Sequence, residues 1–348
     1  MTPRLDPRVF RLPVADIRRG FYTDAYFTRT RRILHRDARH PRVLMQVFTR
    51  GDGIVCGTDE AVAVLKLCAD KPRALRIRAL RDGALMRPRD TVMTIEGDYA
   101  TFAHLETVYL GILARRSALA TNVRRVVAAA DGKPVYFFPA RFDHWLNQPG
   151  DGWAAKVGGA AGVSTNANAA WWRGDGIGTI PHGLIGAYDG NTVAAAEAFD
   201  RHIPREVNRI VLVDWDNDCV GTALACARAL GRRLWGVRLD TSGDLRDRSV
   251  RGPGSASYGV CAELVRNVRN ALNVNGFGWV KIVVSGGFTA DKVKRFVKDQ
   301  VPFDVVGVGS SLLQGRIDFT ADIVRVNGWP CSKVGRTLRP NPRLRLVS

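Results

Sequence analysis

The sequence lacks the features that define several classes of protein. No uncharged apolar run approaches the roughly 18 to 20 residues of a membrane-spanning helix. The first residues are rich in arginine and hold no apolar core of a signal peptide. The six cysteines include no C-x-x-C pair, which argues against a zinc knuckle and a disulfide framework. We therefore expect a cytoplasmic globular protein with buried thiols, no membrane partner and no protein metal site that we can assign.

Acidic residues are scarce relative to basic ones. The 348 residues contain 52 Lys and Arg against 33 Asp and Glu, a formal net charge of +19. Three segments hold almost all of the excess: residues 1–42 carry +7, residues 71–89 carry +6 and residues 332–348 carry +5. Such a field attracts polyanions, whether nucleic acid, a phosphate-rich metabolite or solvent counterions. Residues 332–348 contain no aromatic side chain to interleave with bases, so nucleic acid is not the partner we favour.

The second half of the chain alternates apolar runs of strand length with amphipathic stretches of helical period. Strands are predicted over 135–138, 209–214, 234–239, 280–284 and 305–308, and helices over 192–202, 220–230, 256–272 and 290–297. This order favours repeated βα units and an irregular (β/α) barrel. The first 110 residues differ, because a helix over 57–69 lies among strand candidates at 43–48 and 91–96. They predict a separate α/β layer.

Polar and small residues follow the predicted strands, where barrel enzymes place their chemistry. Asp214 and Asp240 follow two successive strands, and Ser285-Gly286-Gly287 and Gly309-Ser310 follow the next two. Carboxylates in this position suit Mg²⁺ and ribose hydroxyls, whereas Gly and Ser before a helix expose backbone N–H groups to a phosphate. The two small-residue loops predict a phosphate site. The alternative is that the glycines only meet the steric needs of tight turns.

A second group of candidates lies between the two halves. Arg141 follows the strand at 135–138, and residues 158–166 form a loop of small residues that can admit a ligand close to the backbone. His182 follows the apolar stretch at 178–181 and opens a predicted helix. This position indicates catalysis or anion contact for His182.

Nine short motifs, taken in order, resemble the nicotinate phosphoribosyltransferase family of type II phosphoribosyltransferases. They occur at residues 22–27, 95–97 with 105–107, 140–141, 164–166, 178–182, 237–241, 284–288, 307–310 and 333–336, and so span nearly the whole chain. Each motif is short, but their common order makes the resemblance specific.

The resemblance implies an architecture and a reaction. The fold would be an irregular (β/α) barrel over residues 116–314 plus an α/β sandwich domain made of residues 1–115 and the returning residues 315–348. The enzyme would be a homodimer with sites near the subunit interface. It would join nicotinate to phosphoribosyl pyrophosphate, giving nicotinate mononucleotide and pyrophosphate in NAD biosynthesis. Mg²⁺ would accompany the pyrophosphate, and ATP would be a further substrate if the reaction is coupled to ATP hydrolysis, as in a ligase.

The resemblance also assigns residues. Arg141 and Arg238 would lie near the nicotinate carboxylate and the ribose, Tyr22 would stack on the pyridine ring from the neighbouring subunit, and Asp240 would hold ribose hydroxyls. His182 would be the histidine that ATP phosphorylates, and with Arg238 and Asp240 it forms the catalytic set. The remaining residues are substrate contacts at Ser164, Thr165, Thr179 and Asp214, and a 5′-phosphate cradle at Ser285, Gly286, Gly287, Gly309 and Ser310.

Two departures and three alternatives stay open. The segment Arg238–Asp244 is one residue longer than in many relatives, which leaves the role of Asp244 open, and only Cys331 lies where some short relatives have a metal knuckle. Quinolinate phosphoribosyltransferase is the main alternative, although the second carboxylate of its substrate needs more cations than Lys156 and Arg173 supply. Residues 210–216 resemble a type I phosphoribosyltransferase strand, but that fold lacks the later βα units. A basic nucleic-acid-binding protein is the alternative from another class.

Overall fold

The computed structural model describes residues 4–252 and 254–347 and divides into two compact units. The first unit comprises Met1–Asn122, Trp153–Gly158 and Gln314–Ser348, and the second comprises Val123–Gly152 and Gly159–Leu313. Within the described ranges, no helix has the length and apolar character needed to cross a membrane.

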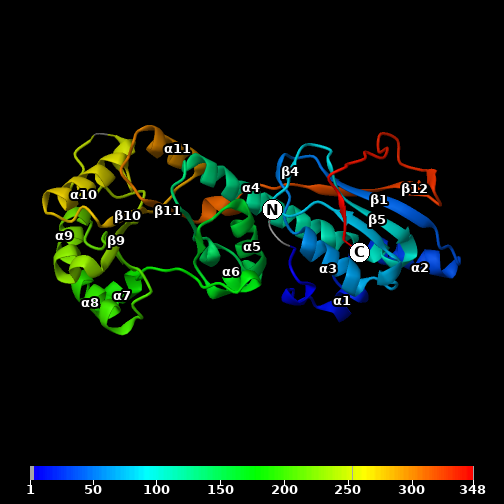
Figure 1. Ribbon diagram of the computed structural model, residues 1–348, viewed down its shortest axis with the longest axis horizontal. Coiled ribbons are helices and arrows are strands. Elements are labelled where there is room, and N and C mark those ends of the chain that lie inside the picture. The colour runs from blue at the N-terminus through cyan, green and yellow to red at the C-terminus, as the bar shows by residue number, and fades with distance from the viewer. Residues whose placement is uncertain (1–3, 253, 348) are drawn as a thin grey trace. The chain divides into compact units, whose positions relative to one another are not determined.

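The first unit is built on a six-stranded antiparallel sheet (Figure 1). Its strands are β13 (Trp329–Pro330), β12 (Phe319–Val326), β1 (Arg42–Thr49), β5 (Thr91–Asp98), β3 (Arg76–Ala79) and β14 (Arg345–Leu346), in that spatial order. A separate pair joins β2 (Gly53–Ile54) to β4 (Leu85–Met86). Because β12 and β14 pair with β1 and β3, the end of the chain completes a sheet that its first hundred residues begin.

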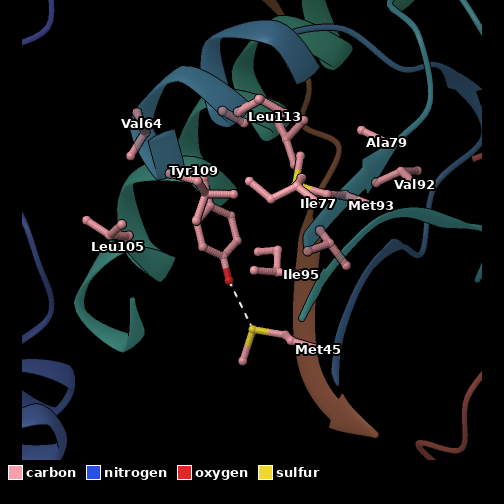
Figure 2. Close-up of a cluster of buried hydrophobic side chains, with 14 of the residues drawn as sticks. Met45, Val64, Ile77, Ala79, Val92, Met93, Ile95, Leu105, Tyr109 and Leu113 are labelled. Carbon is pink, nitrogen blue, oxygen red and sulfur yellow. Dashed lines mark hydrogen bonds between the residues drawn. The ribbon is translucent and has the colours of Figure 1, made fainter. Parts of the chain in front are cut away.

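Helices cover one face of this sheet. The helices are α1 (Val14–Arg18), α2 (Ala25–Arg36), α3 (Thr58–Cys68) and the first part of α4 (Glu106–Ala129). Side chains of α3, α4 and the sheet form one buried cluster, in which the Tyr109 hydroxyl donates to Met45 Sδ at 3.2 Å (Figure 2). Residues alternate along β3, so Ile77 and Ala79 enter this core while Arg76 and Arg78 point away from it. The opposite sheet face is therefore polar along β3.

The second unit holds a curled parallel sheet of six strands (Figure 1). The spatial order is β7 (Gly162–Val163), β6 (Val135–Phe137), β11 (Val305–Val308), β10 (Lys281–Val284), β9 (Leu234–Leu239) and β8 (Arg209–Leu212). Every adjacent pair is parallel, and β7 and β8 are the two edges among the described residues. The prediction of a mixed α/β chain with repeated βα units is confirmed as a half-barrel with a separate antiparallel sheet.

The parallel strands are connected by helices. They include α5 (Gln148–Gly158), α6 (Asn166–Ala169), α7 (His182–Ala187), α8 (Thr192–His202), α9 (Cys219–Leu230), α10 (Ala262–Val274) and α11 (Ala290–Lys298). Asn191, Asp218 and Thr289 cap α8, α9 and α11 by accepting a backbone N–H. The predicted helix 256–272 was wrong at its start. Cys261 Sγ caps α10 by accepting from Leu264 N at 3.5 Å, so the helix begins six residues later than predicted.

Candidate active site

Arg238 is the centre of a hydrogen-bond network at the carboxyl ends of β9 and β10. Its Nε donates to Ser285 Oγ at 2.8 Å and its Nη1 donates to Thr179 Oγ1 at 3.2 Å. Its Nη2 donates to Asp240 Oδ2 at 3.0 Å. The guanidinium carbon lies 5.2 Å from the centroid of the Phe138 ring. Four contacts from four chain segments therefore fix the orientation of one guanidinium.

Ser285 and Asp240 complete this network. Ser285 Oγ accepts from Arg238 and donates to Asp240 Oδ1 at 2.7 Å, so the three side chains form a closed triangle. Ser285 is 3 % exposed, whereas the side chains of Arg238 and Asp240 are 19 % and 17 % exposed. A guanidinium has five N–H donors and three are used here, so two remain for a ligand. Each carboxylate oxygen of Asp240 also keeps a lone pair for a hydroxyl donor.

The loop after Ser285 presents backbone N–H groups. Gly286 and Gly287 have φ of +81° and +67°, a left-handed conformation that side chains rarely adopt. Neither N–H donates a hydrogen bond within the described residues, and the same holds for Gly309 after β11. Successive unpaired N–H groups in such a turn form a concave anion-binding site. The predicted phosphate loop therefore offers its backbone, while its serine side chain positions Arg238.

His182 pairs with Asp214. The imidazole Nε2 lies 3.0 Å from Asp214 Oδ1 and 3.1 Å from Oδ2, which joins the first residue of α7 to the loop after β8. The His182 side chain is 41 % exposed and that of Asp214 is 8 % exposed. Nδ1 has no hydrogen-bond partner in the described part of the chain. The pair therefore leaves one ring nitrogen open.

Asp214 controls the protonation of His182. The hydrogen bond to this carboxylate raises the pKa of His182 above its usual value near 6.5, and partial burial of the ring opposes that rise. The carboxylate of Asp240 adds to the rise, and the charge on Arg238 opposes it. The two hydrogen-bonded groups, Arg238 with Asp240 and His182 with Asp214, are therefore electrostatically coupled.

Three other predicted contacts lie on loops of the same unit. Thr165 caps α6 by accepting from Asn168 N at 3.0 Å, and its hydroxyl also lies 2.9 Å from Gln148 Oε1. Ser164 Oγ is buried and has no hydrogen-bond partner among the described residues. Arg141 is exposed, and its guanidinium lies 5.4 Å from the centroid of the Phe142 ring. Their roles toward a ligand stay predictions, with Ser164 Oγ open to a partner.

The remaining candidates are surface residues. Ser310 is exposed and begins a 3₁₀ turn over Ser310–Leu313, directly after Gly309. Asp244 is exposed and accepts from the Ser242 hydroxyl, which lowers the pKa of this carboxyl group. Tyr22 belongs to the first unit, is 49 % exposed and packs edge to face on Phe21. The roles of these side chains toward a ligand or a partner subunit stay predictions.

Sequence reasoning missed two aromatic residues of this region, Phe138 and Trp215. Phe138 follows β6, and its ring lies over Arg238. Trp215 lies with its ring tilted 33° at 6.4 Å from the His182 ring. Gly190, with φ +80°, leaves room for it, since a Cβ there would lie 2.7 Å from Trp215 Nε1. Phe138 directly follows β6 and Trp215 lies in the loop after β8, so the rule that found Asp240 and Ser285 could have found them.

The donors near this network suit Mg²⁺ only in combination with a substrate. No group of three or more His, Cys, Asp or Glu side chains in the described ranges can hold a metal ion. Asp214 and Asp240 supply oxygen ligands, the kind that Mg²⁺ prefers, and both lie at strand ends of the half-barrel. Mg²⁺ is commonly held by one or two carboxylates together with substrate phosphates. The residues present fit that mode.

Comparisons with known proteins agree with this fold. Residues 24–117 match the family model described as the N-terminal domain of quinolinate phosphoribosyl transferase. A nicotinate phosphoribosyltransferase of Mycobacterium tuberculosis is 31% identical over 245 residues, covering 68% of this chain and 47% of that relative. The solved structure of nicotinate-nucleotide pyrophosphorylase from Pyrococcus furiosus is 35% identical, with a TM-score of 0.82, and covers 97% of this chain and 86% of that one. Human nicotinic acid phosphoribosyltransferase shares the fold, with a TM-score of 0.68 at 17% identity, 91% of this chain and 77% of the human one being covered.

The half-barrel, the glycine loop beside an arginine–aspartate pair and these similarities define a type II phosphoribosyltransferase fold. The chain belongs to the nicotinate phosphoribosyltransferase family, as its motifs predict. It spans about half the length of the curated relatives that it matches, between 45% and 54% of those from Mycobacterium tuberculosis and Bacillus subtilis.

Proposed function

We propose that this protein is a nicotinate phosphoribosyltransferase of NAD biosynthesis. It would transfer the phosphoribosyl group of phosphoribosyl pyrophosphate to nicotinate, giving nicotinate mononucleotide and pyrophosphate. The observation that carries the proposal is the closed triangle of Arg238, Asp240 and Ser285 beside the unpaired N–H groups of Gly286 and Gly287. A cation, a hydroxyl acceptor and an anion cradle are the three groups that a phosphorylated ribose bearing an acidic aglycone requires.

Each part of the substrate has a matching group. The N–H groups of Gly286, Gly287 and Gly309 would bind the 5′-phosphate, with Ser310 at the rim. Asp240 would accept hydrogen bonds from the ribose hydroxyls. The two unused N–H donors of Arg238 would face the nicotinate carboxylate, for which a planar guanidinium offers a bidentate fork. Arg141, Ser164, Thr165 and Thr179 are proposed as further contacts.

The transfer needs no protein nucleophile. The pyridine nitrogen of nicotinate forms a bond to ribose C1′ while the bond from C1′ to the pyrophosphate oxygen breaks, and the leaving group keeps that electron pair. Positive charge develops at the ribosyl carbon and negative charge on pyrophosphate. The Asp240 carboxylate would stabilise the positive charge at the ribosyl carbon, and fixed N–H donors would stabilise the anion without reorganisation. Mg²⁺, when bound with the substrate, would neutralise charge on the leaving pyrophosphate.

We propose that ATP coupling, if present, proceeds through His182 Nδ1. Asp214 engages Nε2, so the open nitrogen is the one able to attack the γ-phosphorus of ATP. The phosphorus–nitrogen bond would form as the bond to the bridging oxygen breaks, and ADP would leave. Asp214 would then stabilise the proton on Nε2 of the phosphohistidine. The chain contains no G-x-x-x-x-G-K-[ST] loop, so ATP would use the phosphate subsites of the same site.

The assembly is part of the proposal. We infer a homodimer in which the exposed Tyr22 of one subunit completes the site of the other. The family fold implies an α/β sandwich of residues 1–115 and 315–348 with a barrel domain of residues 116–314. Mixing the impaired Tyr22→Ala and Arg238→Ala variants should raise activity above that of either variant alone, because a mixed dimer contains one intact site. Absence of recovery in a mixture shown to exchange subunits would refute the shared site.

One assay tests the reaction. The purified protein is incubated with phosphoribosyl pyrophosphate and Mg²⁺ together with nicotinate, nicotinamide or quinolinate, and nucleotide formation is followed. We expect turnover of nicotinate and poor turnover of nicotinamide, because a guanidinium rewards a carboxylate over a neutral amide. Equal turnover of both would refute carboxylate recognition.

Quinolinate is the second candidate substrate, because the matching N-terminal family model is that of quinolinate phosphoribosyl transferase. Its second carboxylate needs a second cation. Arg173 is exposed at the end of a 3₁₀ turn and forms no hydrogen bond with the Arg238 network among the described residues, and Lys156 belongs to the first unit. Faster turnover of quinolinate than of nicotinate would favour this candidate.

A further inference from the structure

The outer face of the antiparallel sheet in the first unit carries a groove built by the end of the chain. The backbone of residues 337–341 crosses this face and is held by two buried side chains. Gln46 Nε2 donates to Thr337 O at 3.1 Å, and Gln46 Oε1 accepts from Arg339 N at 3.0 Å. Thr91 Oγ1 donates to Arg339 O at 2.7 Å, and Asn341 Nδ2 donates to Thr91 O at 2.8 Å. One wall of the groove is therefore hydrogen-bonded firmly to its floor.

The groove is a hollow of about 350 Å³ between this segment and strands β1, β3 and β5. That volume falls in the range of roughly 300 to 1,000 Å³ typical of small-molecule sites. Its apolar lining consists of Leu44, Leu338, Pro340, Pro342 and Leu344, and its polar lining consists of Arg76, Arg78, Thr94, Glu96, Arg339, Asn341 and Arg345. The hollow thus offers an apolar surface beside a cluster of cations.

The four arginines come from two of the basic segments of the sequence. Residues 71–89 supply Arg76 and Arg78, which point outward because β3 alternates, and residues 332–348 supply Arg339 and Arg345. Pairing of β14 with β3 brings these segments together across more than 250 residues of chain.

These guanidiniums lack carboxylate partners. In the described ranges none of the four arginines forms a salt bridge, and the one side-chain hydrogen bond among them runs from Arg345 Nη1 to Pro342 O at 2.9 Å. The single acidic residue of the lining, Glu96, is paired with Arg42 at 3.0 Å. Four arginines against one glutamate leave the lining with a formal charge of +3.

We propose that this groove binds a nucleoside diphosphate or triphosphate, as a site separate from the catalytic residues of the second unit. Guanidinium groups match phosphate in charge and in geometry. The leucine and proline side chains provide an apolar surface for a base. A groove of this size encloses one mononucleotide, and the lining contains no aromatic side chain for stacking successive bases of a nucleic acid. The ligand therefore has a short polyphosphate and one planar ring.

Calorimetric titration of the full-length protein with ADP tests the site. We expect saturable binding that weakens at least tenfold in R76A/R78A, whose side chains are exposed and whose loss leaves the core intact. Arg73→Ala, an exposed arginine of the same basic segment outside the groove, is the matched control and should bind ADP as the wild type does. Pyrophosphate should bind more weakly than ADP, and adenosine more weakly still.

A second pair of measurements distinguishes ADP binding at the groove from ADP binding at the catalytic site. R76A/R78A should keep its phosphoribosyl transfer rate, and Arg238→Ala should lose that rate yet still bind ADP at the groove. If ADP binding depends on Arg238 and not on Arg76 and Arg78, the groove proposal fails while the proposed function stands. Equal binding of ADP by R76A/R78A and wild type, or tighter binding of single-stranded RNA than of ADP to the groove, would also overturn it.

Discussion

Two arginines at opposite ends of the same parallel sheet show how one residue type serves structure in one place and chemistry in another. Arg209 begins β8 at its amino end, and Arg238 lies near the carboxyl end of β9. Both guanidiniums lie over a phenylalanine ring, at 5.5 Å from Phe199 and 5.2 Å from Phe138. Their partners differ. Arg209 is bound by the Asp200 carboxylate and by backbone carbonyl groups of residues 200–207, at the end of α8 and in the loop before β8. Arg238 is bound by the side chains of Thr179, Asp240 and Ser285.

The two arginines differ in how many guanidinium N–H donors remain free for a ligand. All the N–H groups of Arg209 are used, and its side chain is 5 % exposed, so no ligand can reach it. Arg238 keeps two donors at an accessible strand end. Arg209, whose N–H groups all donate to protein acceptors, stabilises the loop before β8. Arg238, which is held by side chains and keeps two free N–H donors, can bind an anion.

The largest expected effect is on stability, at Arg209. Arg209→Ala removes a buried cation from Asp200 and from the carbonyl groups of the loop, and losing one partner of a buried pair costs about 3–5 kcal/mol. We expect the free energy of unfolding in urea to fall by that amount, while kcat/KM per folded molecule stays unchanged. Arg233→Ala is the control, because Arg233 binds the same Asp200 from a side chain that is 63 % exposed. It should cost less than about 1 kcal/mol. A loss of activity without a loss of stability in Arg209→Ala would invalidate the comparison.

Arg238→Ala should produce the opposite pattern. Losing hydrogen bonds to charged groups costs roughly 1.5–3 kcal/mol of transition-state stabilisation, or about 10- to 150-fold in kcat/KM. Steady-state kinetics with nicotinate measures this effect, and circular dichroism checks the fold. Arg238→Lys keeps the charge but loses the planar fork, so it should recover only part of the activity. Wild-type kinetics in Arg238→Ala would remove this residue from the site.

Ser285→Ala should have a smaller effect, through Arg238. The buried hydroxyl is the acceptor for Arg238 Nε and a donor to Asp240, so its loss frees the guanidinium to rotate. We expect the activation free energy that sets kcat to rise by about 1–2 kcal/mol, a typical cost for losing a buried hydrogen bond. The double variant R238A/S285A should lose less than the sum of the single losses, because both changes break one network. Additive losses would instead indicate that Ser285 contacts substrate independently. Ser249→Ala, which removes a hydroxyl bonded to Asp247 in the same unit, is the matched control.

The sequence predicted which residues lie at the strand ends better than it predicted which of these residues contact one another. Asp214, Asp240, Ser285 and Gly286 were found because chemistry follows parallel strands, a local rule that needs no tertiary structure. The bond from Arg238 to Ser285 depends on the spacing of β9 and β10, which a list of residues does not contain. The meeting of two basic segments at β3 and β14 was missed for the same reason, since net charge along a chain says nothing of strand pairing.

The smallest expected effect concerns the pH dependence of any stimulation by ATP. The hydrogen bond from His182 to Asp214 raises the pKa of His182, and only the neutral ring can attack a phosphorus atom. Stimulation by ATP should therefore increase as pH rises through that raised pKa. Asp214→Asn removes the carboxylate that causes the rise, so the pKa falls and the midpoint of stimulation should move to lower pH. His182→Ala should keep slow nicotinate mononucleotide synthesis and lose stimulation at every pH. The measurements are nucleotide formation with and without ATP from pH 6 to 8, and a mass increase of one phosphoryl group mapped to His182. If the Asp214→Asn midpoint stays where it is in the wild type, Asp214 does not set the protonation of the nucleophile. If the His182→Ala variant responds to ATP as the wild type does, His182 only holds Asp214 in place.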